Sequence, residues 1–239
     1  MPKTLLAHLA ITIALVSPAV ALAQASQCRL PEIIARPKVE GPTAEEPKRV
    51  LPIGYYTLAI SWTPQYCKTA RPNADNAFQC RSGNDFGFTL HGLWPDGHGK
   101  EWPQYCKPAG VLPRKVIRDH LCATPSVQLI QHEWVKHGTC MPTTPAKFFA
   151  LSRKLYHALR YPDMDALARR PNLSAQEFAQ AFAAENKGMV ADGIRLNVTR
   201  NGALSEVWIC MDRNFRYMSC PPQQGGVRHR AQLRIEPRG

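Results

Sequence analysis

Eight cysteines behind an export-type N-terminus constrain the fold of this chain more than any other feature. Lys3 is the only charged residue before residue 24, and an apolar run over residues 5–20 leads to the small residues 21–23. This arrangement is typical of a cleaved secretory signal. An even number of cysteines behind such a signal predicts disulfides formed in an oxidising compartment. We therefore expect a disulfide-stabilised protein that is exported, either periplasmic or secreted.

The pairing of the cysteines is only partly predictable. None of them forms a C-x-x-C pair, which argues against a zinc ribbon or a thioredoxin-type redox site. We predict a bond between Cys210 and Cys220, because two strand-like runs flank a short turn there. The other cysteines are Cys28, Cys67, Cys80, Cys106, Cys122 and Cys140.

The N-terminal segment is not expected to anchor the protein in a membrane. Its apolar run is short for a bilayer span, no stop-transfer pattern follows it, and no later segment is apolar enough to cross a membrane. We place the signal peptide at residues 1–23, with cleavage after Ala23 and Ala25 as the alternative. The remaining chain is long enough for one domain with a core.

Proline content and charge divide this remaining chain. Residues 24–53, with prolines at positions 31, 37, 42, 47 and 52, are predicted to form an extended, proline-rich lead-in that lacks its own core. Residues 54–222 form the predicted folded domain, and residues 223–239 a basic C-terminal tail. The formal net charge of +12 favours polyanionic partners such as nucleic acid, although basic exported proteins also use such charge for solubility alone.

Strand and helix patterns are partly segregated along the folded domain. Strands are predicted at residues 55–62, 86–90, 194–199, 206–211 and 215–220. Helices are predicted at residues 126–138, 147–160 and 174–186, with a short one between Asp163 and Pro171. Residues 63–86 are predicted to form a loop. This order favours an α+β fold with a central antiparallel sheet and helices packed on it.

Two histidine clusters contain the candidate catalytic groups. Residues 88–97 have the sequence FTLHGLWPDG and residues 132–140 the sequence HEWVKHGTC, and the ionisable candidates in them are His91, His132, Glu133, Lys136 and His137. Imidazole accepts and donates protons near neutral pH, and a lysine stabilises the negative charge that develops on a phosphoryl group. The set therefore suits acid–base chemistry on a phosphodiester without a metal. The first cluster is predicted at a strand end, in a turn formed by glycine and proline residues.

The second cluster is predicted to lie on a helix. At about 100° per residue, its two histidines, Glu133 and Lys136 fall within one arc of about 140°, and Trp134 and Val135 fall on the other side. The helix would bury the two apolar residues and turn the ionisable ones toward one cleft. The alternative is an ordinary charged helix face stabilised by a Glu133–Lys136 pair.

No metal is expected in the second cluster. The zinc-protease pattern H-E-x-x-H requires histidines at positions i and i+4. Here the second histidine stands at i+5, and Lys136 occupies the i+4 position, where its ammonium would repel a dication. We therefore expect neither a metal ion nor a cofactor.

The two segments resemble the active-site segments of the T2 family of ribonucleases, which are secreted, disulfide-rich, metal-independent endoribonucleases. The resemblance also includes the strand before the first segment and the C-terminal cysteine pair, and it suggests a bacterial member. It implies an α+β fold with an antiparallel sheet and makes residues 54–222 the catalytic domain. It further implies cleavage of single-stranded RNA by transesterification through a 2′,3′-cyclic phosphate.

The resemblance implies a role for each candidate residue. His137 would be the general base on the ribose 2′-hydroxyl, and His91 the general acid on the departing 5′-oxygen. His132 would bind a phosphate oxygen, and Glu133 with Lys136 would stabilise the phosphorane. Trp94 would stack on a base and Asp96 would hydrogen-bond one, although Trp94 also suits a core position and Asp96 a turn before Gly97. The residues alone do not decide which histidine is the base.

A second reading is a non-catalytic, basic exported protein that binds RNA or other polyanions. It rests on the net charge and on six arginines that follow residue 212. The enzyme reading predicts no cleavage of DNA, because the nucleophile is a 2′-hydroxyl, and it expects a monomer. The histidines outside the clusters belong to no motif and are expected at the surface: His98, His120, His157 and His229.

Overall fold

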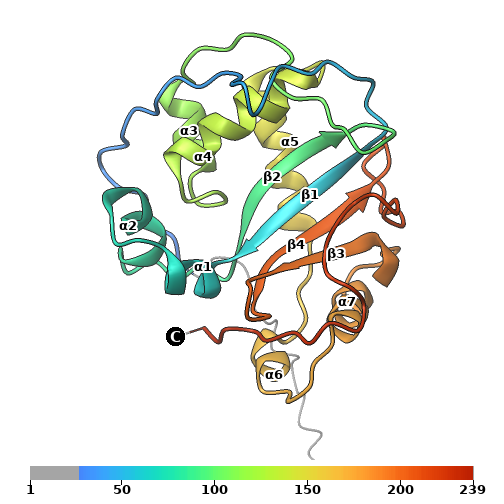
Figure 1. The fold of residues 1–239 in the computed structure, drawn as a ribbon. Coiled ribbons are helices and arrows are strands. Elements are labelled where there is room, and N and C mark those ends of the chain that lie inside the picture. The colour runs from blue at the N-terminus through green and yellow to red at the C-terminus, as the bar shows by residue number, and fades with distance from the viewer. Residues whose placement is uncertain (1–26, 239) are drawn as a thin grey trace, which may run out of the picture.

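The structure, a computed structural model, describes residues 27–238. The predicted signal peptide, residues 1–23, lies outside the described residues. The elements, in chain order, are β1 (Tyr55–Trp62), α1 (Thr63–Thr69), α2 (Ala74–Cys80), β2 (Phe88–Asp96), α3 (Arg114–His120), α4 (Val127–His132), η1 (Glu133–His137), η2 (Gly138–Cys140), α5 (Pro145–Ala158), α6 (Met164–Ala168), α7 (Ala175–Ala184), η3 (Ala191–Gly193), β3 (Ile194–Val198) and β4 (Leu204–Met211) (Figure 1).

The strands of the described chain form one antiparallel sheet in the order β2-β1-β4-β3. Side chains alternate between the two faces of a strand, so Leu58, Ile60 and Trp62 of β1 share one face. All three are buried in the core. The polar residues that alternate with them, Thr57 and Ser61, belong to the opposite face. This sheet, together with the helices around it, confirms the predicted α+β fold.

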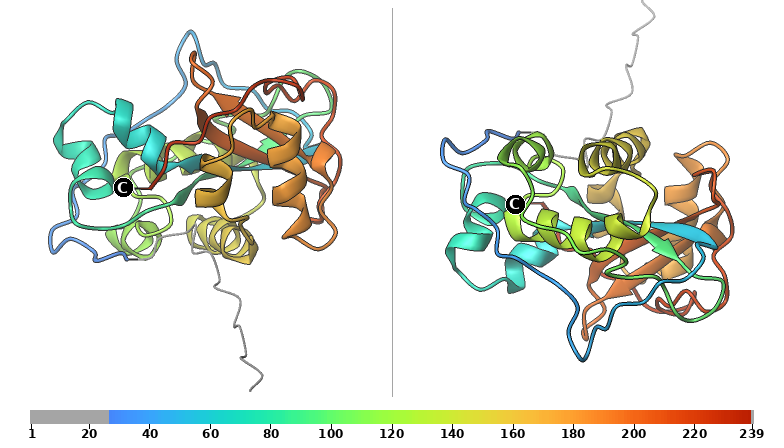
Figure 2. Two further views of the ribbon diagram at one scale, coloured as in Figure 1. Left: turned by 90° about the horizontal axis from the view of Figure 1, so that it is seen from below. Right: turned by 90° about the horizontal axis from the view of Figure 1, so that it is seen from above.

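Helices α5 and α7 cover the apolar face of the sheet. Tyr156 of α5 donates a hydrogen bond to the carbonyl oxygen of Phe88 at 2.8 Å. The ring of Phe182 of α7 packs edge-on against the Phe88 ring, with centroids 6.3 Å apart. Figure 2 shows α5 on this side of the sheet and the loop of the lead-in on the other side. The polar face of the sheet therefore lies on the side opposite α5.

The predicted helices begin at polar capping residues. Ser126, Thr144, Asp163 and Ser174 each accept a hydrogen bond from a backbone N–H in the first turn of α4, α5, α6 and α7. Ser174 and Glu177 form the reciprocal capping box expected from the sequence. The helices predicted at residues 147–160, at residues 174–186 and between Asp163 and Pro171 are thereby confirmed, with their ends within a few residues. The helix predicted at residues 126–138 begins as expected.

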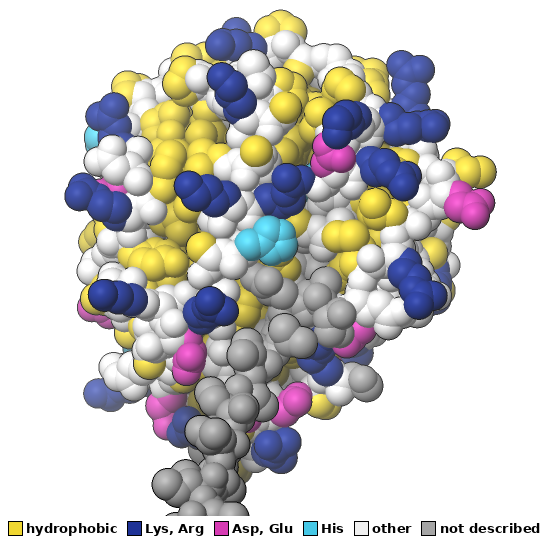
Figure 3. All heavy atoms as spheres, turned by 180° about the vertical axis from the view of Figure 1, so that it is seen from behind, with side chains coloured by type: hydrophobic (Ala, Val, Ile, Leu, Met, Phe, Trp, Pro, Cys, Tyr) yellow, Lys and Arg dark blue, Asp and Glu magenta, His cyan; other side chains and the backbone are white. Residues whose placement is uncertain are grey.

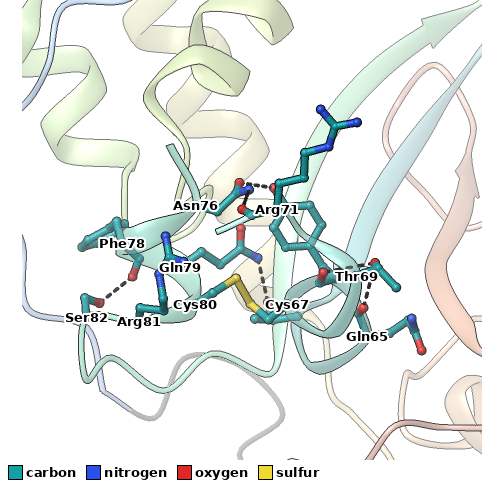
Figure 4. Close-up of a disulfide and its surroundings, with 12 residues drawn as sticks. Gln65, Cys67, Thr69, Arg71, Asn76, Phe78, Gln79, Cys80, Arg81 and Ser82 are labelled. Atoms are coloured by element: carbon teal, nitrogen blue, oxygen red, sulfur yellow. Dashed lines mark hydrogen bonds between the residues drawn. A yellow bond between two sulfur atoms is a disulfide. The ribbon is translucent and has the colours of Figure 1, made fainter. Parts of the chain in front are cut away.

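The loop predicted for residues 63–86 is wrong, because two short helices, α1 and α2, occupy most of it. Cys67 and Cys80 join them in a disulfide, and Gln79 donates a hydrogen bond to Thr63 Oγ1 at 3.0 Å (Figure 4). No residue of α2 is buried. Helix α2 is capped by the side chain of Asn73, whereas α1 has no side-chain cap, and the disulfide joins the two. The sequences of both helices lack the apolar stripe by which a helix is predicted. Helix α3 was also not expected.

The strand predicted at residues 215–220 is wrong. Only an isolated bridge between Met211 and Tyr217 pairs this segment with β4, and Phe215 has a left-handed φ of 61°. The carboxylate of Asp212 accepts hydrogen bonds from the backbone N–H groups of Asn214 and Arg216 and so fixes a turn. The predicted disulfide across this turn, Cys210 with Cys220, is confirmed.

All eight cysteines lie in the described residues and are paired. The predicted disulfide stabilisation is confirmed by Cys28–Cys122, Cys67–Cys80, Cys106–Cys140 and Cys210–Cys220. One surface prediction is wrong: His120 is 2 % exposed, and its ring packs against Phe149 with centroids 4.6 Å apart. Burial lowers the pKa of His120 to about 3, so this histidine is a neutral core residue.

The lead-in and the tail both pack onto the domain between them. Ile34 of the lead-in is buried in the core, and Arg49 pairs with Gln104 in an antiparallel bridge. In the tail, Leu233 and Ile235 are buried as well. Within residues 27–238, no helix has the length and apolar character needed to span a bilayer.

The sheet core supports a first prediction, which uses two isoleucines. Ile60 is 0 % exposed in the centre of the sheet, whereas Ile33 in the lead-in is 82 % exposed. Ile60→Ala leaves a cavity and is expected to lower the free energy of unfolding by about 2–5 kcal/mol. Ile33→Ala is expected to change it by less than about 0.5 kcal/mol. Denaturant unfolding with intact disulfides measures both, and similar losses in the two variants would contradict this core.

Candidate functional site

One cavity of about 530 Å³ brings all seven predicted site residues together on the polar face of the sheet. Strand β2 contributes His91, Trp94 and Asp96, and η1 contributes Glu133, Lys136 and His137. His132 is the last residue of α4. Tyr55 of β1 and Trp208 of β4 also line it. The two clusters, far apart in the sequence, therefore face one space.

Strand β2 reaches the cavity through a β-bulge. Ile60 pairs with Leu90 and Ala59 with Gly92, so His91 is an extra residue without an opposite partner on β1. The predicted strand end at residue 90 is therefore wrong, because the strand continues to Asp96. The bulge shifts the alternation of side chains by one residue. As a result, Leu90 and Leu93 remain in the core while His91 and Trp94 both line the cavity.

The second cluster lies on a π-helical turn rather than on the continuous α-helix that we predicted. After α4, η1 is a π-helix, in which the N–H of Gly138 donates to the carbonyl oxygen of Glu133, five residues earlier. This wider turn brings His132 and His137, also five residues apart, near each other, with ring centroids 6.3 Å apart. The predicted division is confirmed: Trp134 and Val135 are buried in the core, and the ionisable residues line the cavity.

Glu133 lies at the contact between the two segments. Its Oε2 accepts a hydrogen bond from Trp94 Nε1 at 2.8 Å, and it lies directly over Gly92. A Cβ added at Gly92 would be 1.8 Å from Oε2, so only glycine leaves room for this carboxyl group. Burial raises the pKa of Glu133 to about 7, against the opposing influence of His91, Trp94 and Lys136.

His91 lies between two carboxyl groups. Its Nδ1 makes a 2.5 Å hydrogen bond with Oε1 of Glu206 on β4, and its Nε2 lies 3.6 Å from Glu133 Oε1. Burial lowers the pKa of His91, but the hydrogen bond with Glu206 and the charges of both glutamates outweigh it and raise the net pKa above 6.5. This shift favours the protonated form of His91, in which the Nε2 proton is directed away from Glu206.

His137 has the opposite character. It is 7 % exposed, and its Nδ1 has no hydrogen-bond partner among the described residues. Burial lowers the pKa of His137 well below 6.5, and the positive charges of Lys136, His132 and His91 lower it further. Its ring stacks near the Trp94 ring, with centroids 5.5 Å apart. The neutral imidazole of His137 is therefore able to accept a proton at neutral pH.

His132 and Lys136 each contact a glutamate of the lead-in. His132 Nδ1 lies 2.9 Å from Glu40 Oε2, and Lys136 Nζ donates to Glu46 Oε1 at 2.5 Å. The side chain of Lys136 is only 12 % exposed. The hydrogen bond with Lys136 lowers the pKa of Glu46, despite some desolvation, so this pair is ionic at neutral pH.

Asp96 belongs to a buried polar network at one end of the cavity. Thr57 Oγ1 donates to Asp96 Oδ2 at 2.6 Å, Gln224 Nε2 donates to Thr57 Oγ1 at 2.9 Å, and Tyr55 donates to Gln224 Oε1. Burial raises the pKa of Asp96 to about 6, and the hydrogen bond from Thr57 opposes this shift. Asp96 lies within β2 and not in the turn that the sequence offered as an alternative.

Three site side chains could hold a metal ion by geometry. Donor atoms of His132, Glu133 and His137 lie within 4.8 Å of one another. The charge of Lys136 acts on Glu133 and on His137, as their pKa shifts record, so a dication there would meet a fixed ammonium. The donor set alone therefore does not argue for a metal, and the expectation of metal-free chemistry stays a prediction for experiment.

Several residues of this site were missed in the sequence. Glu206 and Trp208 lie in a strand that was predicted, and a glutamate within an otherwise apolar strand was the available signal. Gln224 lies in the segment expected to be a basic tail, and Glu40 and Glu46 lie in the lead-in. No local pattern links these last three residues to the histidine clusters, because only the tertiary fold brings them there.

Comparison with known proteins identifies relatives of this chain. Residues 53–220 match the model of the Ribonuclease T2 family. A probable ribonuclease of Haemophilus influenzae is 30 % identical over 182 residues, which cover 71 % of this chain and 61 % of that protein. A ribonuclease of Aeromonas hydrophila is 30 % identical over 164 residues, which cover 66 % of this chain and 72 % of that protein. The aligned part is thus less than two thirds of the Haemophilus protein.

Solved structures share the fold. Trichomaglin, described as an S-like ribonuclease, superposes with a TM-score of 0.60 at 20 % identity over 78 % of this chain and 100 % of that chain. RNase NT, solved in complex with 5′-AMP, superposes with a TM-score of 0.58 at 22 % identity over 78 % of this chain and 99 % of that chain. At these identities the likeness supports the fold, while the family assignment rests on the sequence match.

The raised pKa of Glu133 predicts a pH-dependent stability. A carboxyl group whose pKa rises from 4.5 to about 7 on folding stabilises the folded state below its unfolded pKa, and this stability is lost as the pH rises through about 7. In Glu133→Gln this loss is absent. The wild type is expected to lose about 3 kcal/mol relative to the variant between about pH 4 and about pH 8.

Denaturant unfolding at a series of pH values measures this difference. Glu185→Gln is the control, because Glu185 follows α7 and is exposed. The difference in unfolding free energy between the wild type and each variant is compared across the pH series. If this difference is as independent of pH for Glu133→Gln as for Glu185→Gln, Glu133 is not a desolvated carboxyl group.

Proposed function

This chain belongs to the ribonuclease T2 family, and we propose that it is an exported endoribonuclease that cleaves single-stranded RNA by transesterification through 2′,3′-cyclic phosphates. The match to the Ribonuclease T2 family confirms the family that the two segments suggested, and it supports the predicted class of enzyme, a metal-independent endoribonuclease. One observation carries the mechanism: two histidines in one cavity have pKa values shifted in opposite directions. Opposite shifts of this kind assign an acid and a base.

The first step transfers a proton at each end of one displacement. Neutral His137 takes the proton of the ribose 2′-hydroxyl, and the 2′-oxygen forms a bond to phosphorus. Protonated His91 gives its Nε2 proton to the 5′-oxygen as the bond between this oxygen and phosphorus breaks. The products are a 2′,3′-cyclic phosphate and a free 5′-hydroxyl. After this step His137 is protonated and His91 is neutral. Each of these proton transfers contributes about 10²–10⁴ in rate.

Three groups stabilise the charge that develops on the phosphorane oxygens. Lys136 supplies positive charge and N–H donors, and His132 supplies a ring nitrogen on the same side of the cavity. Glu133, with a pKa of about 7, is protonated in part at neutral pH and then donates a hydrogen bond to a phosphate oxygen. Its fixed place over Gly92 holds this donor still during the reaction.

The second step opens the cyclic phosphate with water. His91, now neutral, takes a proton from the water as its oxygen forms a bond to phosphorus. His137, now protonated, returns its proton to the 2′-oxygen as that bond breaks. The acid and the base exchange roles, and both return to their initial states. Because water is a poorer nucleophile than the held 2′-hydroxyl, this step is slower.

Trp94 and Asp96 are proposed to bind a base. Both line the cavity, and the Trp94 ring is held by its hydrogen bond to Glu133 and by edge contacts with the rings of His91 and Trp208. Such a fixed aromatic plane suits stacking on a base of single-stranded RNA. The Asp96 carboxyl group, held by Thr57, can accept from or donate to a base edge because its pKa lies near 6.

We also propose that the protein is exported and monomeric. Four disulfides in the described chain fit an oxidising compartment, in agreement with the periplasmic or secreted location predicted. RNA is the proposed substrate, DNA is not, and the protein is proposed to act as a monomer. A reaction through the 2′-hydroxyl excludes DNA on chemical grounds.

The rival function, a non-catalytic polyanion-binding protein, receives less support. Figure 3 shows Lys and Arg side chains dispersed over the face behind the sheet, among hydrophobic and neutral groups, rather than gathered in one patch. Two of the six C-terminal arginines, Arg216 and Arg238, form ion pairs with Asp212 and Asp85. The charge that suggested this function is therefore spread out on this face, and two of the C-terminal arginines are paired with carboxylates.

Substrate chemistry gives the most direct test of the proposed function. A short single-stranded RNA is expected to be cut in excess EDTA, leaving 2′,3′-cyclic phosphate ends at early times. The matching 2′-deoxy oligonucleotide is expected to remain intact. Mass spectrometry of the product ends measures both. Cleavage of the deoxy substrate, or loss of RNA cleavage in EDTA, would reject this mechanism.

The assigned acid and base predict the effect of removing either histidine. His91→Ala and His137→Ala are each expected to lower kcat by about 10²–10⁴, because each removes one proton transfer. RNA binding is expected to persist in both. His229→Ala, at an exposed position in the tail, serves as the control. A near-normal rate in either of the first two variants would remove that histidine from the scheme.

Glu206 is proposed as a positioning residue for His91, and its removal predicts a shifted pH profile. The glutamate favours the protonated imidazole, so Glu206→Gln lowers the pKa of His91 and the acid loses its proton at a lower pH. The alkaline limb of the kcat/KM profile is therefore expected to move to lower pH. An unchanged limb, with only a uniform loss of rate, would mean that Glu206 has a structural role alone.

A further inference from the structure

We propose that the lead-in, residues 24–53, contributes two positioning residues to the active site. These are Glu40, which orients His132, and Glu46, which orients Lys136. The matched family segment begins at residue 53, so both glutamates lie outside it. This inference rests on the proposed function, in which His132 and Lys136 face the phosphate. It assigns two further residues to that reaction, from a segment that the sequence predicted only as an extended, coreless stretch.

Each glutamate is itself held in place by a second donor. Glu40 contacts His132 Nδ1 through Oε2, at 2.9 Å, and accepts from Gln128 Nε2 of α4 through Oε1. Glu46 contacts Lys136 Nζ through Oε1, at 2.5 Å, and accepts from the Tyr105 hydroxyl through Oε2, at 3.1 Å. A carboxylate bound at both oxygens has one orientation and can therefore fix the orientation of its partner.

The two glutamates contact His132 and Lys136 from outside the cavity and do not fill it. His132 and Lys136 line the cavity, whereas Glu40 and Glu46 are absent from its lining. Glu40 binds Nδ1 of His132, which leaves Nε2 for a substrate, and Glu206 binds His91 in the same way. Lys136 gives one of its three N–H donors to Glu46 and keeps two. The contacts thus leave the groups that would meet the phosphate unobstructed.

Several contacts hold the lead-in against the folded domain, and a segment that orients other residues needs such contacts. Cys28 is bonded to Cys122, and Ile34 is 3 % exposed within the core. The backbone of Arg49 exchanges two hydrogen bonds with Gln104, each of 2.9 Å. Attachments on both sides of Glu40 and Glu46 argue against a lid that opens, and so they favour constant positioning over an inhibitory contact.

The test uses the full-length protein with intact disulfides. Glu40→Gln and Glu46→Gln keep the side-chain length and remove the charge. Each is expected to lower kcat/KM on single-stranded RNA by about tenfold, the scale seen when an orienting partner is lost. Glu45→Gln is the matched control, because Glu45 lies in the same segment and is exposed. Melting temperatures close to wild type in all three variants would exclude a loss caused by misfolding.

A double-mutant cycle shows whether each glutamate acts through its partner. Glu40→Gln is expected to have little further effect in a His132→Ala background, and Glu46→Gln little further effect in a Lys136→Met background, because the group to be held is gone. Glu40→Asp keeps the charge and is expected to recover part of the rate that Glu40→Gln loses. A merely structural role would instead give additive losses and no recovery.

A spectroscopic readout separates this inference from the proposed function. The Nδ1 proton of His132, shared with Glu40, is expected as a downfield NMR signal in the wild type and in Glu45→Gln, and it is expected to be lost in Glu40→Gln. Failure of the wild type to cleave RNA would reject the proposed function, and this signal would still report on Glu40. The inference is overturned by an unaltered signal, by additive losses, or by a rise in kcat/KM, as an inhibitory contact predicts.

Discussion

The packing of Glu133 onto Gly92 is the contact on which the site depends. It joins the π-helical turn to the bulged strand, because a buried carboxyl group fits over a residue that has no side chain and hydrogen-bonds the indole of Trp94. Through this contact the two histidine clusters face each other across one cavity. Two local irregularities, the bulge at His91 and the five-residue turn of η1, provide the necessary side-chain directions.

The surroundings of His91 and His137 give the two imidazoles different pKa values. Lys136 lowers the pKa of both His91 and His137, yet their pKa values shift in opposite directions, because only His91 has glutamates at both ring nitrogens. His132 also has a carboxylate at its Nδ1, and this carboxylate is Glu40 of the lead-in. Three separate segments, β4, η1 and the lead-in, thus contribute the groups that set the protonation and orientation of the proposed phosphate-binding residues.

The sequence predicts most of this site but not its geometry. The apolar and ionisable residues of HEWVKH are correctly divided by a helical wheel, because Trp134 and Val135 must be buried in either helix type. The π-turn and the bulge could not be predicted, since both arise from packing between distant segments. Glu40, Glu46 and Gln224 were missed for the same reason. Conversely, a strand was predicted at residues 215–220 from β-forming residues, and the hydrogen bonds of Asp212 turn the chain instead.

A crystal structure of the wild-type protein with a bound 3′-nucleotide would test the central claim most directly. The account predicts that the phosphorus lies in the cavity between the rings of His91 and His137, with phosphate oxygens on Lys136 and His132 and the base against Trp94. It would be contradicted by a phosphate bound on the C-terminal arginines with the cavity unoccupied, or by a phosphate in the cavity that only one of the two rings can reach.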